Sequence, residues 1–171
     1  MISPYRLQLI ITGRHDKRQA VAWITAVALR GPLSIVAGSE WVPSYSVARA
    51  IRQDTVEVER VLGNVRLARA FTCYQLLDLL ASTRGDGTPI LVLDFLHTFF
   101  SPDILLPVRI RTLQACCRNL RRLSLRQPVT VFAVQETDPD YEIFYALLSA
   151  SMDEVIQPAA EEAIIWQPGL F

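Results

Sequence analysis

The sequence predicts an α/β fold, a three-layer sandwich in which helices cover both faces of a mainly parallel sheet. Short apolar segments alternate with amphipathic helical segments along the whole chain. Most of the apolar segments are hydrophobic at nearly every position, which is typical of strands that are covered on both faces. Strands that alternate with helices of this length imply right-handed crossover connections and therefore parallel pairing.

The expected elements follow one another without a linker, a low-complexity tract or an internal repeat. The expected strands are residues 7–12, 33–38, 64–69, 89–94, 129–135 and 153–157, and a last one at 162–166 could pair with its predecessor as a hairpin. The expected helices are residues 17–29, 44–62, 73–83, 103–125 and 140–150. With 171 residues, of which 51% are hydrophobic, the chain suits one domain with a sizeable core, so residues 1–171 are predicted to form a single domain.

Composition excludes several classes of protein. No apolar run reaches the length of a membrane span, and the start of the chain lacks the apolar stretch of a signal peptide, so we expect a cytoplasmic protein without a membrane contact. The cysteines, Cys73, Cys116 and Cys117, are odd in number and two are adjacent in a helical pattern, which favours reduced thiols over a disulfide framework. His15 and His97 have no companion ligands at metal spacing, so no zinc site is expected.

Charge is divided unevenly along a chain whose formal net charge is zero. All 17 basic residues lie at or before Arg126, together with nine acidic residues, so this part carries a net charge of +8. From Gln127 onward the chain holds eight acidic residues and no basic one. This asymmetry indicates an interaction surface, or else two parts that neutralise each other in the fold, and the sequence leaves both open.

The loop between the first strand and the first helix lies where many nucleotide-binding proteins hold a phosphate. The pattern G-x-x-x-x-G-K-[ST] supplies backbone N–H groups, a lysine for the phosphates and a hydroxyl for Mg²⁺. Here Gly13 and Lys17 are present, the second glycine is missing, and Arg18 stands in place of the hydroxyl residue. Only three residues separate Gly13 from Lys17, which is too short to wrap a triphosphate. We favour an ordinary strand-to-helix turn, with weak attraction of an anion at the helix N-terminus as the alternative.

Polar residues follow several of the predicted strands, at the edge where parallel sheets collect functional groups. Glu40 follows the second strand, Asp94 ends the fourth, and Gln135 ends the fifth. A glutamate, an aspartate and a glutamine at neighbouring strand ends could position a water, a metal ion and a phosphate sensor. The alternative for Asp94 and Glu40 is a strand-end carboxylate that caps a following turn.

Four segments resemble the core of the RecA/RadA-type DNA recombinases and their paralogues. "LSIVAGSEW" is similar to the family's strand ending in Thr/Ser-Glu-Gly, and "NVRLARAFTCYQLLDLL" to its Ala-Arg-Ala strand and the His-Gln-x-x-Leu-Leu helix after it. "ILVLDFLHTFF" is similar to the Walker B strand, and "VTVFAVQE" to the strand ending in Asn-Gln. The resemblance spans most of residues 7–157 and implies a RecA-like P-loop NTPase core.

In an active member of that family, the resemblance implies that Glu40 orients the attacking water, Asp94 lies near the Mg²⁺ of the nucleotide, and Gln135 senses the γ-phosphate. Several departures point away from activity. Trp41 replaces the family's glycine after the glutamate, and the segment "ETDPDYE" is short and acidic where the family has a DNA-binding loop. Two carboxylates without a nucleotide–metal complex perform no phosphoryl transfer.

The sequence therefore predicts a non-catalytic, RecA-like accessory protein in DNA recombination or repair, with a degenerate Walker A loop and no cofactor. It would bind a protein partner, such as another RecA-like subunit, with sequence-independent binding of DNA as a further option. The alternative is a RecA-like ATPase with an unusual phosphate loop, which would use ATP and Mg²⁺ through Gly13, Lys17, Asp94 and Gln135.

Two groups of residues are candidates for contact with DNA or a partner. The segment "RIRTLQACCRNLRRLSLR" places Arg111, Arg118 and Arg122 on one helical face, which either tracks phosphates or is a solvated face that pairs with acidic residues. The opposing stripe should face the sheet and consists of Ile110, Leu113, Cys117 and Leu120. Phe95 is expected in the core, and Phe99 and Phe100 are expected to be exposed and to form a partner-binding patch.

Overall fold

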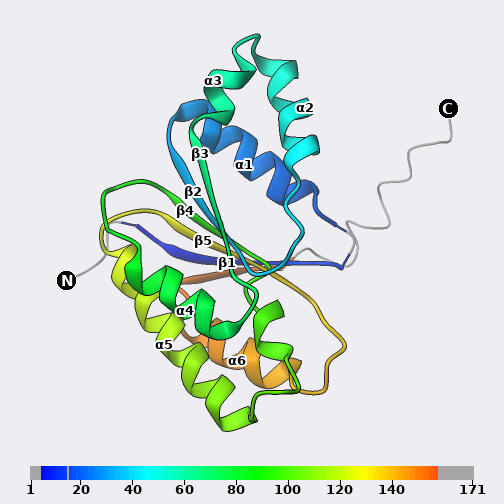
Figure 1. The fold of residues 1–171 in the computed structure, drawn as a ribbon, viewed down its shortest axis with the longest axis vertical. Helices are drawn as coiled ribbons and strands as arrows, with labels where there is room; N and C mark the ends of the chain where they lie inside the picture. The colour runs from blue at the N-terminus through cyan, green and yellow to red at the C-terminus, as the bar shows by residue number, and fades with distance from the viewer. Residues whose placement is uncertain (1–4, 15, 158–171) are drawn as a thin grey trace, which may run out of the picture.

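The computed structural model describes residues 5–14 and 16–157, which form an α/β sandwich around one six-stranded sheet (Figure 1). The strands are β1 Leu7–Thr12, β2 Leu33–Ala37, β3 Val65–Arg69, β4 Ile90–Leu93, β5 Val129–Val134 and β6 Glu154–Ile156. Their order in the sheet is β3-β2-β4-β5-β1-β6, and each of these pairs is parallel. The predicted α/β class is confirmed, and the described sheet is wholly parallel rather than mainly so. The predicted strand 162–166 lies outside the described residues.

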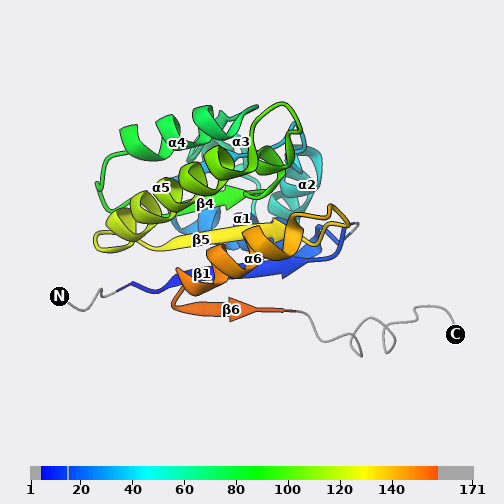
Figure 2. The ribbon, with the colours of Figure 1, turned by 90° about the horizontal axis from the view of Figure 1, so that it is seen from below.

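Helices cover both faces of the sheet, as the continuous apolar strands require (Figures 1 and 2). The helical elements are α1 Arg18–Arg30, α2 Ser44–Asp54, α3 Val58–Leu62, α4 Cys73–Ser82, the 3₁₀ turn η1 His97–Phe100, α5 Leu106–Ser124 and α6 Tyr141–Ala150. Helices α1–α3 lie on one face, and α4–α6 lie on the other. No helix in the described part of the chain is long and apolar enough to cross a membrane.

The single helix predicted over 44–62 is wrong, because the chain forms two helices with a break between them. Thr55 adopts an extended conformation with φ −153° and ψ 154°. Its hydroxyl accepts a hydrogen bond from the backbone N–H of Glu57 at 3.1 Å, and the helix resumes at Val58. A threonine side chain that bonds to a nearby backbone group competes with the helical hydrogen bonds, which explains the interruption.

Alternate side chains of each central strand enter different cores. On β1, Leu7, Leu9 and Ile11 pack with the α4–α6 layer, whereas Ile10 packs with α1–α3. Three of the four residues predicted as the inward stripe of α5 are fully or almost fully buried, which confirms the orientation of that helix. The three cysteines are free and buried, and burial raises the pKa of each thiol, as expected for structural, reduced cysteines.

The predicted exposure of Phe99 is wrong, because its ring is fully buried. The 3₁₀ turn, closed by a hydrogen bond of 3.0 Å from the Phe99 N–H to the Leu96 carbonyl, directs the ring into the core. Ring centroids lie 5.5 Å from Phe95, which is buried as predicted, and 5.8 Å from Phe144. Phe100 is half-buried and meets the Phe144 ring edge-on at 5.7 Å. These phenylalanines therefore support the α4–α6 core and form no exposed patch.

Candidate functional site

The carboxyl ends of the strands bring several of the predicted residues to one edge of the sheet. Because β5 lies between β1 and β4, the loop after β1 faces the ends of both strands. A small hollow of about 120 Å³, which we call the Lys17 hollow, opens there. It is lined by Arg14, Lys17, Asp94, His97, Val134 and Glu136. Glu40 is exposed and lines a neighbouring hollow with Trp41, while Gly13 and Gln135 line a third.

Asp94 is held in place by the loop that follows β2. Its carboxylate accepts a hydrogen bond of 2.5 Å from the Ser39 hydroxyl, and that hydroxyl accepts one of 3.2 Å from the Trp41 N–H. Asp94 has a φ of 49°, a left-handed conformation that is uncommon for residues other than glycine and that clusters at functional sites. Gly38 allows the close approach of β2, since a Cβ there would lie 2.5 Å from the Asp94 carbonyl oxygen.

Lys17 immediately precedes α1, and its ammonium group lies on the indole of Trp41. The Nζ atom is 3.7 Å from the ring centroid, which is the geometry of a cation–π contact. Trp41 directly follows Glu40 in the loop after β2. Its indole thus provides a partner for the lysine charge within the chain itself.

Asp16 places a carboxylate at the N-terminus of α1, the position where a helix attracts an anion. Its Oδ1 accepts hydrogen bonds from the backbone N–H of Arg18 at 3.3 Å and from the Arg18 side chain at 3.2 Å. These contacts with Arg18 hold the pKa of the Asp16 carboxyl below its usual range. A tight turn, with the Asp16 N–H donating to the Gly13 carbonyl at 3.1 Å, sets this geometry. Sequence reasoning missed this role, although an aspartate just before a helix start is a recognised signal.

The end of β5 adds further polar groups to this edge. Glu136 forms an ion pair of 3.1 Å with Arg14, which draws the acidic loop after β5 towards the loop after β1. The Gln135 backbone N–H donates to the Thr12 carbonyl at 3.0 Å. The Gln135 side chain has no hydrogen bond to any residue in 5–14 or 16–157 and faces a cavity described below.

The arginines of α5 have different environments. Arg109 is buried and donates to the carbonyls of Phe99 and Ile104, each at 2.9 Å, and to the Asp140 carboxylate at 3.1 Å. Arg121 binds the Asp153 carboxylate at 2.9 Å. These two side chains therefore tie α5 to the loop after η1, the start of α6 and the start of β6.

The three arginines predicted to share a face are all exposed. Arg122 donates to the carbonyl oxygens of Leu80, Ala81 and Thr83 at 3.0, 3.4 and 3.3 Å, and so binds the C-terminal end of α4. Arg111 and Arg118 form no ion pair within the part of the chain that the structure describes. Two cations thus remain available on this face, and the third is engaged by backbone.

A second surface, missed by sequence reasoning, is an apolar hollow of about 460 Å³ on the α1–α3 side, which we call the β3 hollow. Its lining residues are Ile24, Ile35, Val42, Ser44, Tyr45, Val47, Ala48, Leu62, Val65 and Leu67. Tyr45 is 76% exposed and Leu67 is 43% exposed. In the sequence, the apolar residues Val65 and Leu67 alternate with polar neighbours. This alternation is the signal that could have identified a strand with one open face.

The β3 hollow adjoins an open edge of the sheet. The Leu33 N–H donates to the Asn64 carbonyl, and the Ala70 N–H donates to the Ala37 carbonyl. These two hydrogen bonds show which alternate residues of β3 pair with β2. The residues between them, Val65, Leu67 and Arg69, therefore direct their N–H and C=O groups away from β2. An apolar hollow therefore lies beside a row of outward backbone donors and acceptors.

Residues 5–14 and 16–157 contain no group of three or more His, Cys, Asp and Glu side chains that could hold a metal ion. Neither the models of known protein families nor the curated protein sequences contain a match to this chain. Two features of the chain thus bear on its function, the occupied turn before α1 and the open β3 edge.

Proposed function

We propose that this chain is a non-catalytic, RecA-like accessory protein of DNA recombination or repair that binds a partner subunit. The four segments that resemble the recombinase core lie on β2, β3 with α4, β4 and β5. The ends of β4 and β5 and the loop after β1 surround one hollow, as the shared chemistry of that family requires. The resemblance and this common edge support a RecA-like core.

The observation that carries the non-catalytic assignment is the occupied turn at Asp16 and Lys17. The carboxylate of Asp16 already binds the N–H of Arg18, so a phosphate there would meet a negative charge. The Lys17 ammonium contacts Trp41. The Lys17 hollow measures about 120 Å³, whereas pockets for small ligands ordinarily measure about 300 to 1,000 Å³. These residues do not fit a bound magnesium–nucleotide complex.

Calorimetric titration with Mg-ATP tests this assignment. We expect no micromolar site in the wild type, and the same result for Lys17→Ala and for Arg30→Ala, a matched loss of a cation at the other end of α1. The competing function is a RecA-like ATPase, which is favoured by the position of Asp94 beside Lys17. A micromolar dissociation constant that Lys17→Ala abolishes and Arg30→Ala leaves intact would establish the ATPase instead.

For the partner, we propose that an extended segment adds to the outer edge of β3 and inserts an apolar side chain into the β3 hollow. Backbone groups of Val65, Leu67 and Arg69 supply hydrogen bonds, and the hollow supplies selectivity, as in other cases of strand addition. An open edge with exposed apolar side chains beside it is otherwise an aggregation hazard, which a partner would cover.

Capture of partners from the native cells tests this surface, with the wild type and two variants as bait. Leu67→Glu places a charge at the β3 hollow, and Leu125→Glu places one beyond α5, at a leucine of nearly the same exposure, 42% against 43%. We expect a protein retained by the wild type and Leu125→Glu and lost with Leu67→Glu. A lone monomer in capture and in light scattering for all three would refute partner binding.

DNA binding is tested separately on the arginine face of α5. If these arginines contact phosphates and not bases, fluorescence anisotropy should report binding that weakens as the salt concentration rises. The slope of log affinity against log salt concentration should be roughly 0.7 to 0.9 per phosphate contact. Single- and double-stranded oligonucleotides should be compared at two salt concentrations, with and without the partner. The variant Arg111/Arg118/Arg122→Ala should bind less than the matched control Arg30/Arg49/Arg52→Ala. Equal binding by wild type and variant would remove DNA from this face.

A further inference from the structure

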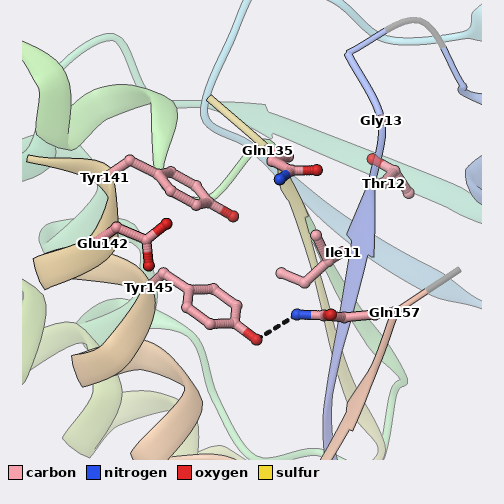
Figure 3. Close-up of a pocket in the computed structure, with 8 residues that line it drawn as sticks. All are labelled: Ile11, Thr12, Gly13, Gln135, Tyr141, Glu142, Tyr145 and Gln157. Atoms are coloured by element: carbon pink, nitrogen blue, oxygen red, sulfur yellow. Dashed lines mark hydrogen bonds between the residues drawn. The ribbon is translucent and has the colours of Figure 1, made fainter. Parts of the chain in front are cut away.

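A slot opens between α6 and the carboxyl ends of β1, β5 and β6, with a volume of about 270 Å³ (Figure 3). We call it the tyrosine slot. Its lining residues are Ile11, Thr12, Gly13, Gln135, Tyr141, Glu142, Tyr145 and Gln157. Tyr141, Glu142 and Tyr145 come from α6 and form one wall, while Gln135, Ile11 and Gln157 face them from the strand ends. The slot lies beside the Lys17 hollow but is lined by different residues.

The phenol of Tyr141 gives the slot a polar atom that a ligand can reach. The residue is 6% exposed, its hydroxyl points into the slot, and that hydroxyl has no hydrogen-bond partner among residues 5–14 and 16–157. The residue as a whole is buried, but its oxygen is not enclosed, because it opens into the slot. A ligand group in the slot can therefore form a hydrogen bond with this oxygen.

The charge of the lining excludes an anion. No lysine or arginine lines the slot, and Glu142 contributes a carboxylate. Burial, and then the charges of Tyr145, Glu142 and Glu136 in that order, raise the pKa of Tyr141 to about 12. The phenol therefore remains neutral at physiological pH, and the charged group of the slot lining is the Glu142 carboxylate.

The aromatic rings and the acceptor oxygens of the slot indicate which kind of cation fits it. The rings of Tyr141 and Tyr145 stack with centroids 5.8 Å apart and planes 18° apart, which gives the α6 wall two aromatic groups side by side. Acceptor oxygens stand on the α6 wall, from the phenols and Glu142, whereas the amides of Gln135 and Gln157 turn their nitrogen atoms towards the slot from the strand ends. The Gln157 amide already donates to the Tyr145 oxygen at 2.5 Å, which orients that pair.

We propose that the tyrosine slot binds a guanidinium group. A guanidinium is planar, carries five N–H donors in fixed directions and packs on aromatic side chains, whereas an ammonium offers a compact point charge. No arginine or lysine occurs after Arg126, so the residues that follow the slot in the sequence carry no guanidinium or ammonium group. The guanidinium comes either from an arginine of a protein or from a small guanidino compound. Its binding requires neither an occupied β3 hollow nor the absence of nucleotide.

Titration monitored by aromatic NMR of the tyrosine rings tests the slot. The ligands are N-acetyl-arginine amide, agmatine as a small guanidino compound, N-acetyl-lysine amide, and N-acetyl-citrulline amide as the neutral, nearly isosteric control. We expect saturable shifts of the Tyr141 and Tyr145 resonances with a guanidinium ligand. Its affinity should exceed that of the citrulline and lysine compounds about tenfold, because the guanidinium combines a positive charge with several directed hydrogen bonds.

Two variants and their matched controls show whether the binding is in the slot. Tyr141→Phe and the exposed Glu142→Gln should each weaken binding about three- to tenfold. Tyr74→Phe on α4 and Glu59→Gln on α3, at exposed positions elsewhere, should leave it unchanged. Because Glu142 is exposed, its variant keeps the test decisive even where the buried substitution disturbs folding.

Each outcome decides the proposal. Tighter binding of N-acetyl-arginine amide assigns the slot to a side chain of a protein, and tighter binding of agmatine assigns it to a small compound. Equal affinity for the citrulline compound, no saturable shift with any guanidinium ligand, or binding that Glu142→Gln leaves unchanged would overturn it.

Discussion

The two helical layers differ in how completely they cover the strands beneath them. In the α4–α6 layer, Phe95, Phe99 and Phe144 are fully buried in one aromatic cluster. In the α1–α3 layer, Tyr45 and Leu67 remain exposed beside the β3 hollow. Both layers cover the same parallel sheet, so the difference lies in how each helix is seated on it (Figure 1).

The seating of α2 explains the opening. Helix α2 packs mainly against α1 and α3, whereas α5 and α6 pack against each other over the central strands. The outer strand β3 is thus left with half-covered side chains on the α1–α3 side. A layer that closes over its strands stabilises the fold, and a layer that stops short leaves apolar surface available for binding.

The largest expected difference between the layers comes from truncating one apolar residue in each. Phe99→Ala should destabilise the protein by about 3 to 5 kcal/mol, because it empties a fully buried site. Leu67→Ala should cost less than about 1 kcal/mol, since its side chain is already 43% exposed. Urea unfolding followed by circular dichroism measures both. Equal losses would mean that the α1–α3 layer is as closely packed as the other.

Within the α4–α6 layer, the buried Arg109 can be compared with the exposed Arg111. Arg109→Met should cost about 3 kcal/mol, because it leaves two carbonyls and the Asp140 carboxylate without their donor. Arg111→Met, an exposed position two residues away, should stay within about 0.5 kcal/mol of the wild type. Thermal unfolding compares the two, and a neutral Arg109→Met would show that packing alone holds this layer.

A smaller effect is expected at the end of α4. Arg122→Ala removes the donor to three carbonyls of that helix terminus and should cost about 1 kcal/mol. Arg118→Ala, without an ion pair among the described residues, is the matched control and should be close to neutral. Unfolding curves that coincide for the two variants would place Arg122 with Arg118 as a solvated cation.

The smallest effect concerns the ion pair that joins α5 to β1 and β6. Hydrogen bonds from Arg121, and then from the Leu7 N–H, hold the pKa of the Asp153 carboxyl below its usual value of 3.8. A lowered folded-state pKa stabilises the protein above the unfolded-state pKa, and this contribution disappears as pH falls through the folded value.

Asp153→Asn should therefore cost about 0.5 kcal/mol at neutral pH, since both partners are partly exposed and screened by solvent. The difference from the wild type should vanish as pH falls below 3.8. Denaturation at several pH values measures this, with the exposed Asp54→Asn as control. A difference that persists unchanged in acid would assign the effect to geometry rather than charge.

The fold class was determined by the sequence, because the spacing of apolar residues follows from the geometry of each strand and helix. The continuous apolar stretch at 129–135 and the stripe of α5 predicted their elements and their inward faces, which the structure confirms. The sequence also identified the altered loop at Gly13 and Lys17, since a missing glycine is visible without any partner. The sequence also predicted that Asp94 and Lys17 lie at the carboxyl ends of the strands, and the structure brings both residues to the Lys17 hollow.

Tertiary structure alone decided what those side chains contact, because burial depends on elements that are distant in the sequence. Phe99 was predicted to be exposed from its polar neighbours, yet its environment comes from α6, more than forty residues later. Lys17 meets Trp41, and Tyr141 faces Gln135 and the end of β1, only after the crossover connections align the strands. Local pattern determines which face of an element is apolar, whereas the packing of the layers determines whether that face is closed, open or hollowed into a site.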